Sequence, residues 1–287
     1  MTTAPQLTPA AAPDTMGLRR VPIQTLGPSG LNPCTDSVVV EEPLEIRLAA
    51  AGSRDAQSLA ITMRTPGDDL CLAAGFLFAE GLLRHADDIA DLRHCGNAGN
   101  VVRIDTIAGA PLPGERSARN FQSTSSCGVC GKASIEAVTS LLPISTVDPA
   151  GSVEAARLRT MPQQLRDAQK LFAASGGLHA VGLFTTDGSL LSLHEDVGRH
   201  NAMDKLIGHC LLEHRLPLSR HVVVLSGRAS FELLQKAMAA GAPIVAAIGA
   251  PSSLAVELAQ KSGITLIGFL REQSFNVYCG AERVSWQ

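Results

Sequence analysis

The sequence predicts an α/β protein in which a three-layer C-terminal domain follows a smaller α+β N-terminal domain. In the C-terminal half, three short apolar runs, Val222–Leu225, Ile244–Ile248 and Ile264–Phe269, alternate with two helical patterns, Phe231–Ala240 and Leu254–Lys261. Strands separated by helices of this length pair in parallel through right-handed crossovers. The chain has 287 residues, of which 45% are hydrophobic, so it can bury a substantial core.

Further elements are predicted on both sides of that alternation. The turn signal Thr186–Ser189 separates two strands, and an amphipathic helix, Asn201–Glu213, follows them. In the N-terminal part, alternating and β-branched residues favour strands, and the Pro-Gly-Asp-Asp sequence within Thr65–Asp69 opens a helix. The remaining predicted strands are Leu178–Phe184, Leu190–His194, Ser37–Val40, Glu45–Ala49, Leu59–Met63 and Asn100–Ile107, and the N-terminal helix is Leu70–Leu83.

Composition shifts along the chain suggest four segments. Residues 1–20 are expected to form a disordered tail, since their start is rich in Ala, Pro and Thr and lacks the basic and apolar blocks of a secretion signal. The N-terminal α+β domain is expected over 21–122. Residues 123–131 contain small polar residues, glycines and two cysteines, which is typical of a flexible loop. The C-terminal α/β domain is expected over 132–287.

The composition also limits the partners and the location. A net charge of −3 and 3% aromatic residues do not favour nucleic acid. The uncharged run Ala237–Val256 is divided by glycine, proline and serine, so no membrane span is expected. Seven cysteines, an odd number scattered over a long chain, argue against a disulfide framework. They favour a reducing compartment, and the predicted location is the cytoplasm.

Loops that follow the three parallel strands are the first candidate binding site. Ser226–Ser230 and Ala250–Ser253 run straight into helices, and Arg271–Gly280 follows the last strand. Ligands of open α/β sheets gather at the carboxyl ends of the strands. Free N–H groups, serine hydroxyls and an arginine there could hold an anion. The alternative is that Ser230 and Ser253 are ordinary helix N-caps.

Two polar segments flank the predicted hairpin. Gly176–His179 precedes it, and His194–Asn201 follows it directly before a helix. His200 and Asp204 lie four residues apart on one helical face, with Lys205 beside them. This crowding suggests a second part of the site. The alternative is that the two acids of this segment cap the helix and that each histidine is structural.

The pair Cys127 and Cys130 allows several interpretations. As a zinc site it lacks an obvious second pair of ligands, and a deaminase motif fits neither the residues near His194 nor their order in the chain. A thioredoxin-like pair would sit in a compact, aromatic-rich turn, which this segment is not. A reactive thiolate that carries persulfide sulfur fits better, because Lys132 and a helix N-terminus follow. From the spacing alone, carrier, redox, zinc and structural roles all stay open.

Taken together, these segments resemble the FdhD family, the formate dehydrogenase accessory sulfurtransferases. The resemblance runs in order from about Glu41 to the C-terminus. The segments that carry it are Glu41–Leu44, Met63–Asp68, Ala74–Leu77, Glu80–Gly81, Ser125–Gly131, Gly176–His179, Glu195–Asp204, Ser226–Glu232, Ala250–Leu254 and Phe275–Gly280.

This resemblance implies a sulfurtransferase. Members of that family accept sulfur from a cysteine desulfurase as a persulfide on the C-x-x-C loop. They pass it to the molybdenum cofactor, bis(molybdopterin guanine dinucleotide), before that cofactor enters formate dehydrogenase. Cys127 would carry the persulfide and Cys130 would assist. The resemblance further implies a cytidine-deaminase-like C-terminal domain without zinc chemistry, a homodimer, and no tightly held cofactor or metal.

The family's cofactor-binding segment is expected at Phe275, Asn276, Val277, Tyr278, Cys279 and Gly280. The loop arguments add Gly177, His179, His200, Ser226, Gly227, Arg228 and Ser252 to the predicted site. Two alternatives stay open. One is a cofactor chaperone that binds and hands over its ligand without carrying sulfur, and the other is a zinc-dependent, deaminase-like hydrolase.

Overall fold

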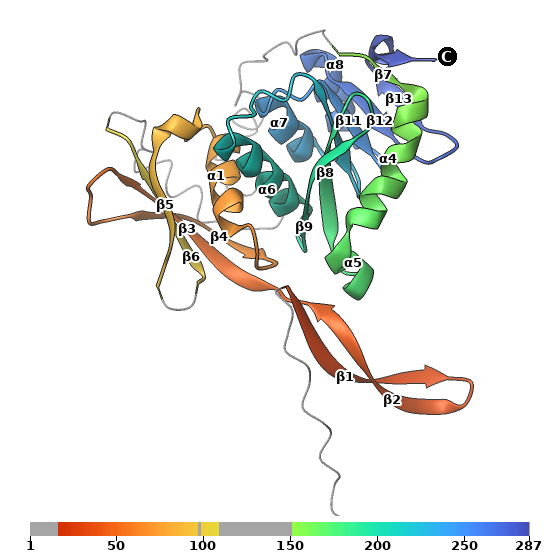
Figure 1. Cartoon of the computed structure of the whole chain (residues 1–287), viewed down its shortest axis with the longest axis horizontal. Coiled ribbons are helices and arrows are strands. Elements are labelled where there is room, and N and C mark those ends of the chain that lie inside the picture. Colours follow the sequence, from red (N-terminus) through yellow and green to blue (C-terminus); the bar gives the residue numbers. More distant parts are fainter. Residues whose placement is uncertain (1–16, 97–98, 109–150, 287) are drawn as a thin grey trace, which may run out of the picture.

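A computed structural model describes residues 17–96, 99–108 and 151–286 of the chain (Figure 1). Its largest unit is a six-stranded sheet in the order β13-β12-β11-β10-β8-β9. The three strands β10, β11 and β12 pair in parallel, which confirms that prediction, and the other neighbours pair antiparallel. The strands are β8 (His179–Thr185), β9 (Leu190–Asp196), β10 (His221–Leu225), β11 (Ile244–Ala247), β12 (Thr265–Gly268) and β13 (Asn276–Cys279).

Helices cover both faces of this sheet, so the predicted three layers are present. Val223 and Val245 pack with α6 (Arg199–Leu212), α7 (Phe231–Ala239) and α8 (Ser253–Ser262). The alternate residues Val222, Val224 and Ile244 pack with α4 (Ala155–Ala168) on the opposite face, and α5 (Lys170–Ser175) follows α4. Successive side chains of a strand point to opposite faces, and both faces of this sheet are buried. These strands therefore appear in the sequence as continuous apolar runs.

The N-terminal part is a four-stranded sheet in the order β4-β3-β6-β5, with α1 (Asp69–Ala79) against one face (Figure 1). The strands are β3 (Glu42–Ala50), β4 (Gln57–Arg64), β5 (Ile89–Cys95), which the sequence did not predict, and β6 (Val101–Thr106). A short 3-10 turn, η1 (Ala86–Asp88), precedes β5. The helix ends at Ala79, earlier than predicted, because Gly81 takes a positive φ and turns the chain.

A long hairpin, β1 (Leu18–Gly27) with β2 (Gly30–Val39), projects from the body (Figure 1). Its first strand begins within residues 1–20, which were expected to be tail. The prolines and alanines before Leu18 favoured that interpretation. From Leu18 onward, however, the residues form a strand that pairs with β2. At the other end of the chain, β7 (Val153–Glu154) pairs with β14 (Val284–Ser285), which follows the 3-10 turn η2 (Ala281–Arg283).

The predicted loop over 123–131, with Cys127 and Cys130, lies outside the described residues, as does the helix predicted after it. Among the residues that the structure describes, no helix is long and apolar enough to cross a membrane.

Candidate functional site

The candidate site is the edge of the six-stranded sheet at which the parallel strands end. Strand β8 runs antiparallel to β10, so its first residue, His179, lies at this edge, and it pairs in register with Asp196 at the end of β9. The predicted residues that the fold brings to this edge are Gly177, His179, His200, Ser226, Gly227, Arg228 and Ser252. A Cβ atom on Gly227 would lie 3.3 Å from His179 Nδ1, so these two segments touch.

Positive charge gathers at this edge. Burial lowers the pKa of His179, and the nearby charges of Arg199, His200 and Arg228 act in the same direction. Neither Arg199 nor Arg228 forms an ion pair with another residue of the described ranges. An anion near His179 could therefore pair with two guanidinium groups that form no ion pair with a described carboxylate.

The two helix N-termini at the edge differ. Ser252, rather than the predicted Ser253, is the N-cap of α8, and its hydroxyl accepts a hydrogen bond from the Ala255 N–H at 3.3 Å. Ser230 is the N-cap residue of α7, but its hydroxyl makes no capping bond and is buried without a partner in the described part of the chain. The first-turn N–H groups of α7 are thus left for another acceptor.

The loops after β10 and β11 are held tightly together. Gly249 donates its N–H to the Gly227 carbonyl at 2.8 Å, and a Cβ atom on Gly249 would lie 2.9 Å from that same oxygen. Ser226 accepts a hydrogen bond from the Ala180 N–H through its hydroxyl at 2.8 Å. The Ser226 hydroxyl therefore ties the loop to β8, while the glycines let the backbones approach closely.

Only one end of the predicted segment Phe275–Gly280 reaches this edge. The segment forms β13, in which Asn276 lies opposite Gly268 and Cys279 opposite Leu266. Cys279 and Gly280 thus lie at the other end of the strand, roughly 10 Å away at about 3.4 Å per residue. The Cys279 thiol donates to the Ile264 carbonyl at 3.3 Å, and burial raises its pKa. Val277 and Tyr278 pack against opposite faces of the sheet.

Phe269 is an edge residue that the sequence did not reveal as part of a site. It is 44% exposed and has a φ of 52°, which is unusual for a bulky side chain. Its N–H bonds the Gly249 carbonyl at 3.1 Å, and the next residue, Leu270, is fully buried. These two contacts hold the strained backbone in place. No sequence pattern predicts a positive φ at a phenylalanine.

A buried network fastens the edge to the N-terminal part. Lys205 Nζ lies 2.8 Å from Asp196 Oδ2, and both side chains are buried. Lys205 also donates to the Thr65 carbonyl at 2.9 Å, while the Thr65 N–H donates to Asp196 at 3.1 Å. Asn201 donates to Asp196 at 3.0 Å and to the Met63 carbonyl at 2.7 Å. Asp196 therefore joins two parts of the chain and does not cap α6.

His200 and Asp204, which were expected to share one helical face, face different partners on α7. His200 Nε2 lies 2.7 Å from Glu232 Oε2 in a close but poorly aligned contact. Asp204 and Lys236 form a buried ion pair of 2.6 Å. Burial raises the pKa of Asp204, and the Lys236 ammonium opposes that shift. Removing either partner would leave a buried charge without compensation.

The hydrogen bond between His194 Nδ1 and Asp68 Oδ2, 2.9 Å long, leads to a pH-dependent prediction. This bond, together with the charges of His194 and Lys205, lowers the pKa of Asp68. A carboxyl group whose pKa is lowered on folding stabilises the folded state at any pH above its pKa in the unfolded chain, about 3.9 for aspartate. That stabilisation is lost as the pH falls from there through the lower pKa of the folded state.

The variant Asp68→Asn, which tolerates the positive φ of 55°, should therefore melt below the wild type at pH 7. The difference in Tm should shrink as the pH falls below about 4. Asp87→Asn is the control, since Asp87 is exposed and its side chain pairs with no other described residue, and it should show little difference at either pH. An Asp68→Asn difference that stays constant down to pH 3 would contradict the assignment.

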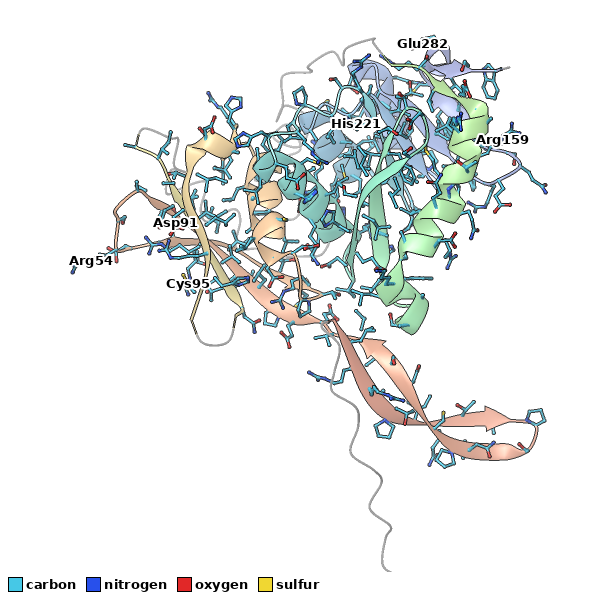
Figure 2. The ribbon with its side chains drawn as sticks, viewed as in Figure 1. Arg54, Asp91, Cys95, Arg159, His221 and Glu282 are labelled. Carbon is cyan, nitrogen blue, oxygen red and sulfur yellow. The ribbon has the colours of Figure 1, made fainter. Side chains whose placement is uncertain are left out.

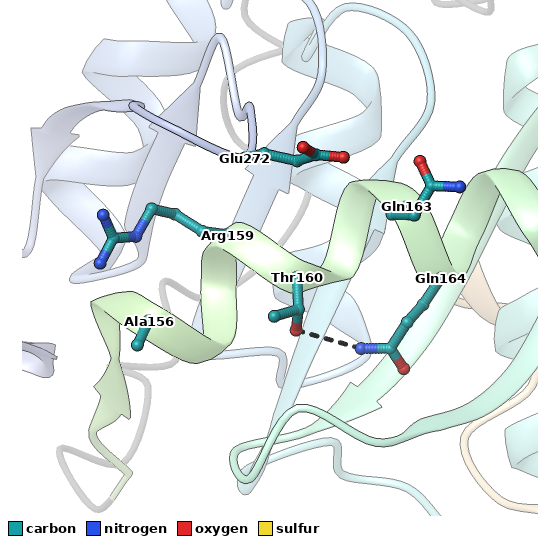
Figure 3. A pocket seen from close by; sticks show the side chains of 6 residues that line it. All are labelled: Ala156, Arg159, Thr160, Gln163, Gln164 and Glu272. Carbon is teal, nitrogen blue, oxygen red and sulfur yellow. Dashed lines mark hydrogen bonds between the residues drawn. The ribbon is translucent and has the colours of Figure 1, made fainter.

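Two other features do not coincide with this edge. In the described ranges, no group of three or more His, Cys, Asp and Glu side chains could hold a metal ion. An open groove of about 530 Å³ lies along α4, lined by Ala156, Arg159, Thr160, Gln163, Gln164 and Glu272 (Figure 3). None of the predicted site residues lines it. The residues at the edge, rather than this groove, carry the chemistry that the sequence singled out.

Comparisons with known proteins agree with the resemblance. The sequence model of the FdhD/NarQ family matches residues 39–285. The sulfur carrier protein FdhD of Mycolicibacterium paratuberculosis is 50% identical over 273 residues, which cover 93% of this chain and 97% of that protein. The sulfur carrier protein FdhD of Streptomyces avermitilis is 52% identical over 258 residues, or 87% and 89% of the two chains.

A solved structure, described as a formate dehydrogenase accessory protein of Desulfotalea psychrophila, superposes with a TM-score of 0.75 at 25% identity. The match covers 94% of this chain and all of that one. The fold, the order of the motifs and nearly the full length of the relatives thus agree, and the chain belongs to the FdhD/NarQ family.

Proposed function

We propose that this chain is a sulfurtransferase that takes sulfur from a cysteine desulfurase and delivers it to the molybdenum cofactor of formate dehydrogenase. The observation that carries the proposal is the likeness, over nearly the whole chain, to relatives named as sulfur carrier proteins. Cys127 holds the sulfur as a persulfide and Cys130 assists; both lie outside the described residues. The cofactor, bis(molybdopterin guanine dinucleotide), is cargo that the protein binds and releases.

The loading step is an exchange between thiolate and persulfide. The Cys127 thiolate attacks the outer sulfur of the persulfide on the donor enzyme. A new sulfur–sulfur bond forms on Cys127, the bond between the donor's two sulfurs breaks, and the donor cysteine leaves as a thiolate. The rate depends on the thiolate fraction of Cys127, which Lys132 close by in the sequence favours.

The sheet edge is our proposed binding site for the cofactor's nucleotide. Arg199 and Arg228 offer charge to phosphate oxygens, and the first turn of α7 offers N–H groups beside the unbonded Ser230 hydroxyl. The close approach of the Gly227 and Gly249 backbones leaves no side chain between the loops at that point. His179 and His200 border the same edge and would contact the ligand from the β8 side.

Phe269 is proposed to stack against the guanine base. A positive φ at a phenylalanine costs roughly 1–2 kcal/mol of stability. A purely structural role would not explain why an exposed aromatic residue stands at this position. Base stacking on an aromatic ring contributes about 1–3 kcal/mol per base.

Phe269→Gly should therefore leave the Tm unchanged or raise it, while weakening the binding of guanosine diphosphate roughly 5- to 150-fold. Isothermal titration and thermal unfolding check the two effects. Binding of inorganic pyrophosphate serves as the control and should stay within about twofold, since it has no base to stack. A parallel loss of stability and of pyrophosphate binding would show that Phe269 is merely structural.

The direct test of sulfur transfer is intact-protein mass spectrometry after incubation with a cysteine desulfurase and cysteine. A mass gain equal to sulfur, removable by a reductant, supports the carrier. Binding of the cofactor without that gain would favour a chaperone instead. Near-stoichiometric zinc in the purified protein, lost when Cys127 and Cys130 are both replaced, would favour the hydrolase.

A further inference from the structure

Two histidines meet where β9, α6 and the start of α1 come together. His194 lies on β9 and His209 on α6, and the centres of their rings are 5.1 Å apart with a tilt of 51° between the ring planes. Asp68, the residue before α1, contacts the pair through His194. Three elements that are distant in the sequence thus converge here, and none of these residues belongs to the proposed nucleotide site.

Each of the two imidazoles has a carboxylate at one of its nitrogens. His194 Nδ1 lies 2.9 Å from Asp68 Oδ2, and His209 Nε2 lies 3.5 Å from Glu213 Oε2, one turn further along the chain. Such a carboxylate orients the ring and makes the opposite nitrogen a better ligand, and histidines that bind metal ions almost always have a partner of this kind. The nitrogens that remain for a ligand are His194 Nε2 and His209 Nδ1.

The free nitrogen of His194 is buried. The residue is 7% exposed, and Nε2 has no hydrogen-bond partner within the described part of the chain. Ser192 stands two residues earlier on the same face of β9, and its hydroxyl is likewise buried without a described partner. Buried polar groups are normally hydrogen-bonded, so two unpaired groups on one strand face indicate a ligand that these side chains do not themselves supply.

Asp68 gives a second indication. Aspartate is a preferred N-cap residue, and its carboxylate usually accepts a hydrogen bond from the first turn of its own helix. Asp68 is the N-cap residue of α1, but its side chain makes no capping bond, and its φ of 55° lies in the left-handed region. The carboxylate orients the His194 ring instead. The fold thus gives up a helix cap to hold one imidazole in place.

The spacing of the two rings fits a shared metal ion. Zinc binds an imidazole nitrogen at about 2.0–2.1 Å with tetrahedral angles, which places the centres of two such rings roughly 5 Å apart. The observed separation is 5.1 Å, and the tilt of 51° differs from the near-parallel planes of stacked rings. Imidazole nitrogens suit Zn²⁺, Cu²⁺ and Ni²⁺, whereas Mg²⁺ and Ca²⁺ prefer oxygen ligands.

A third histidine, His221 at the start of β10, provides a contrast (Figure 2). Its Nδ1 is also buried without a hydrogen-bond partner among the described residues. However, the charged side chain that acts on its ring is the Arg215 guanidinium rather than a carboxylate, and no second histidine ring of the described ranges packs against it. An unpaired nitrogen alone therefore does not distinguish the pair; its two carboxylates and its two adjacent rings do.

We propose that His194 Nε2 and His209 Nδ1 bind one divalent transition-metal ion of the zinc type, while Asp68 and Glu213 orient the rings. Water occupies the other positions of the ion, since the described ranges contain no group of three or more ligating side chains at one point. The ion ties β9 to α6 and, through Asp68, to α1, so its binding stabilises the fold. This site goes beyond the proposed function and does not depend on it.

Isothermal titration of Zn²⁺ into the full chain tests the site, with Cys127→Ser/Cys130→Ser as the parent so that the C-x-x-C thiols cannot hold the ion. The parent should bind one Zn²⁺ per chain and no Mg²⁺. Asp68→Asn should weaken binding roughly 10- to 100-fold, and His209→Ala at least roughly 100-fold. His94→Ala, at an exposed histidine of β5, is the matched control and should bind like the parent. A parent that binds no Zn²⁺, or His209→Ala with the parent's affinity, would overturn the proposal.

Thermal unfolding gives a second readout that holds even if a variant is less stable than the parent. Zn²⁺ at about a hundredfold excess over its Kd should raise the Tm of the parent by roughly 5–10 °C. It should leave the Tm of His209→Ala unchanged, whatever that Tm is. An equal rise in both proteins would place the ion elsewhere and contradict the proposal. With Cys127 and Cys130 intact, His209→Ala should still accept sulfur from the desulfurase, so this test and that of the carrier fail independently.

Discussion

A chain in which Cys127 is replaced by alanine is expected to gain no sulfur from a cysteine desulfurase and to restore no formate dehydrogenase activity in cells that lack the native protein. The reason is chemical. Persulfide exchange needs a thiolate as nucleophile, and removing the attacking sulfur leaves no atom to which the new sulfur–sulfur bond can form. Intact-protein mass spectrometry and a complementation assay check the two parts of the expectation.

Other cysteines of the chain give the matched controls for this experiment. Cys210 is fully buried, and burial raises its pKa to about 11, so it is a poor nucleophile at neutral pH. Cys34 is exposed, but it lies on strand β2 of the projecting hairpin and not in the C-x-x-C segment. Cys34→Ala should load sulfur like the wild type, and Cys130→Ala should still load while delivering sulfur less well. Binding of guanosine diphosphate should stay unchanged in Cys127→Ala, because the proposed nucleotide site lies on the sheet edge. Full complementation by Cys127→Ala would end the carrier hypothesis.

The sequence predicted the parallel core of the C-terminal half well because burial there is complete. Val222–Leu225 and Ile244–Ala247 are buried on both faces, so they form unbroken apolar runs between two helices with clear periodicity. Such runs specify both the strands and the parallel connections. The edge that collects His179, Ser226 and Ser252 follows from that topology, and its position could therefore be predicted without coordinates.

The missed features depend on contacts that are remote in sequence. Helix α4 was missed because it carries Pro162 and many polar residues, and only the sheet beneath it shows why Leu158 and Met161 are buried. The segment Phe275–Gly280 was expected to be a loop, but pairing with β12 draws its second half along the sheet and away from the edge. The strain at Phe269 likewise arises from the Gly249 carbonyl and the buried Leu270, neither of which a local pattern contains.

The crossing of α1 and α6, which joins the two halves of the chain, also depends on distant residues. A Cβ atom on Gly75 would lie 1.9 Å from the Asp204 carbonyl oxygen, and one on Gly208 would lie 1.8 Å from the Cys71 carbonyl oxygen. The two helices thus touch backbone to backbone. Gly75 of α1 lies against the backbone of α6, and Gly208 of α6 lies against the backbone of α1. Asp204 and Lys205 stand on the same stretch of α6, so this contact also sets where their ion pairs with Lys236 and Asp196 lie.

Gly75→Ala and Gly208→Ala are therefore expected to destabilise the fold, although alanine is favoured over glycine in an ordinary helix by about 1 kcal/mol. An overlap with rigid backbone forces the helices apart and should cost on the order of 3 kcal/mol or more. For a domain of this size, that corresponds to a fall in Tm of roughly 6–12 °C. Gly27→Ala, at a glycine with nothing within 4 Å of the added Cβ, is the matched control and should change the Tm little. Since the displaced backbone carries Asp204 and Lys205, the remaining folded Gly208→Ala protein should also bind guanosine diphosphate more weakly. Wild-type stability in both variants would mean that the helices do not meet at these glycines.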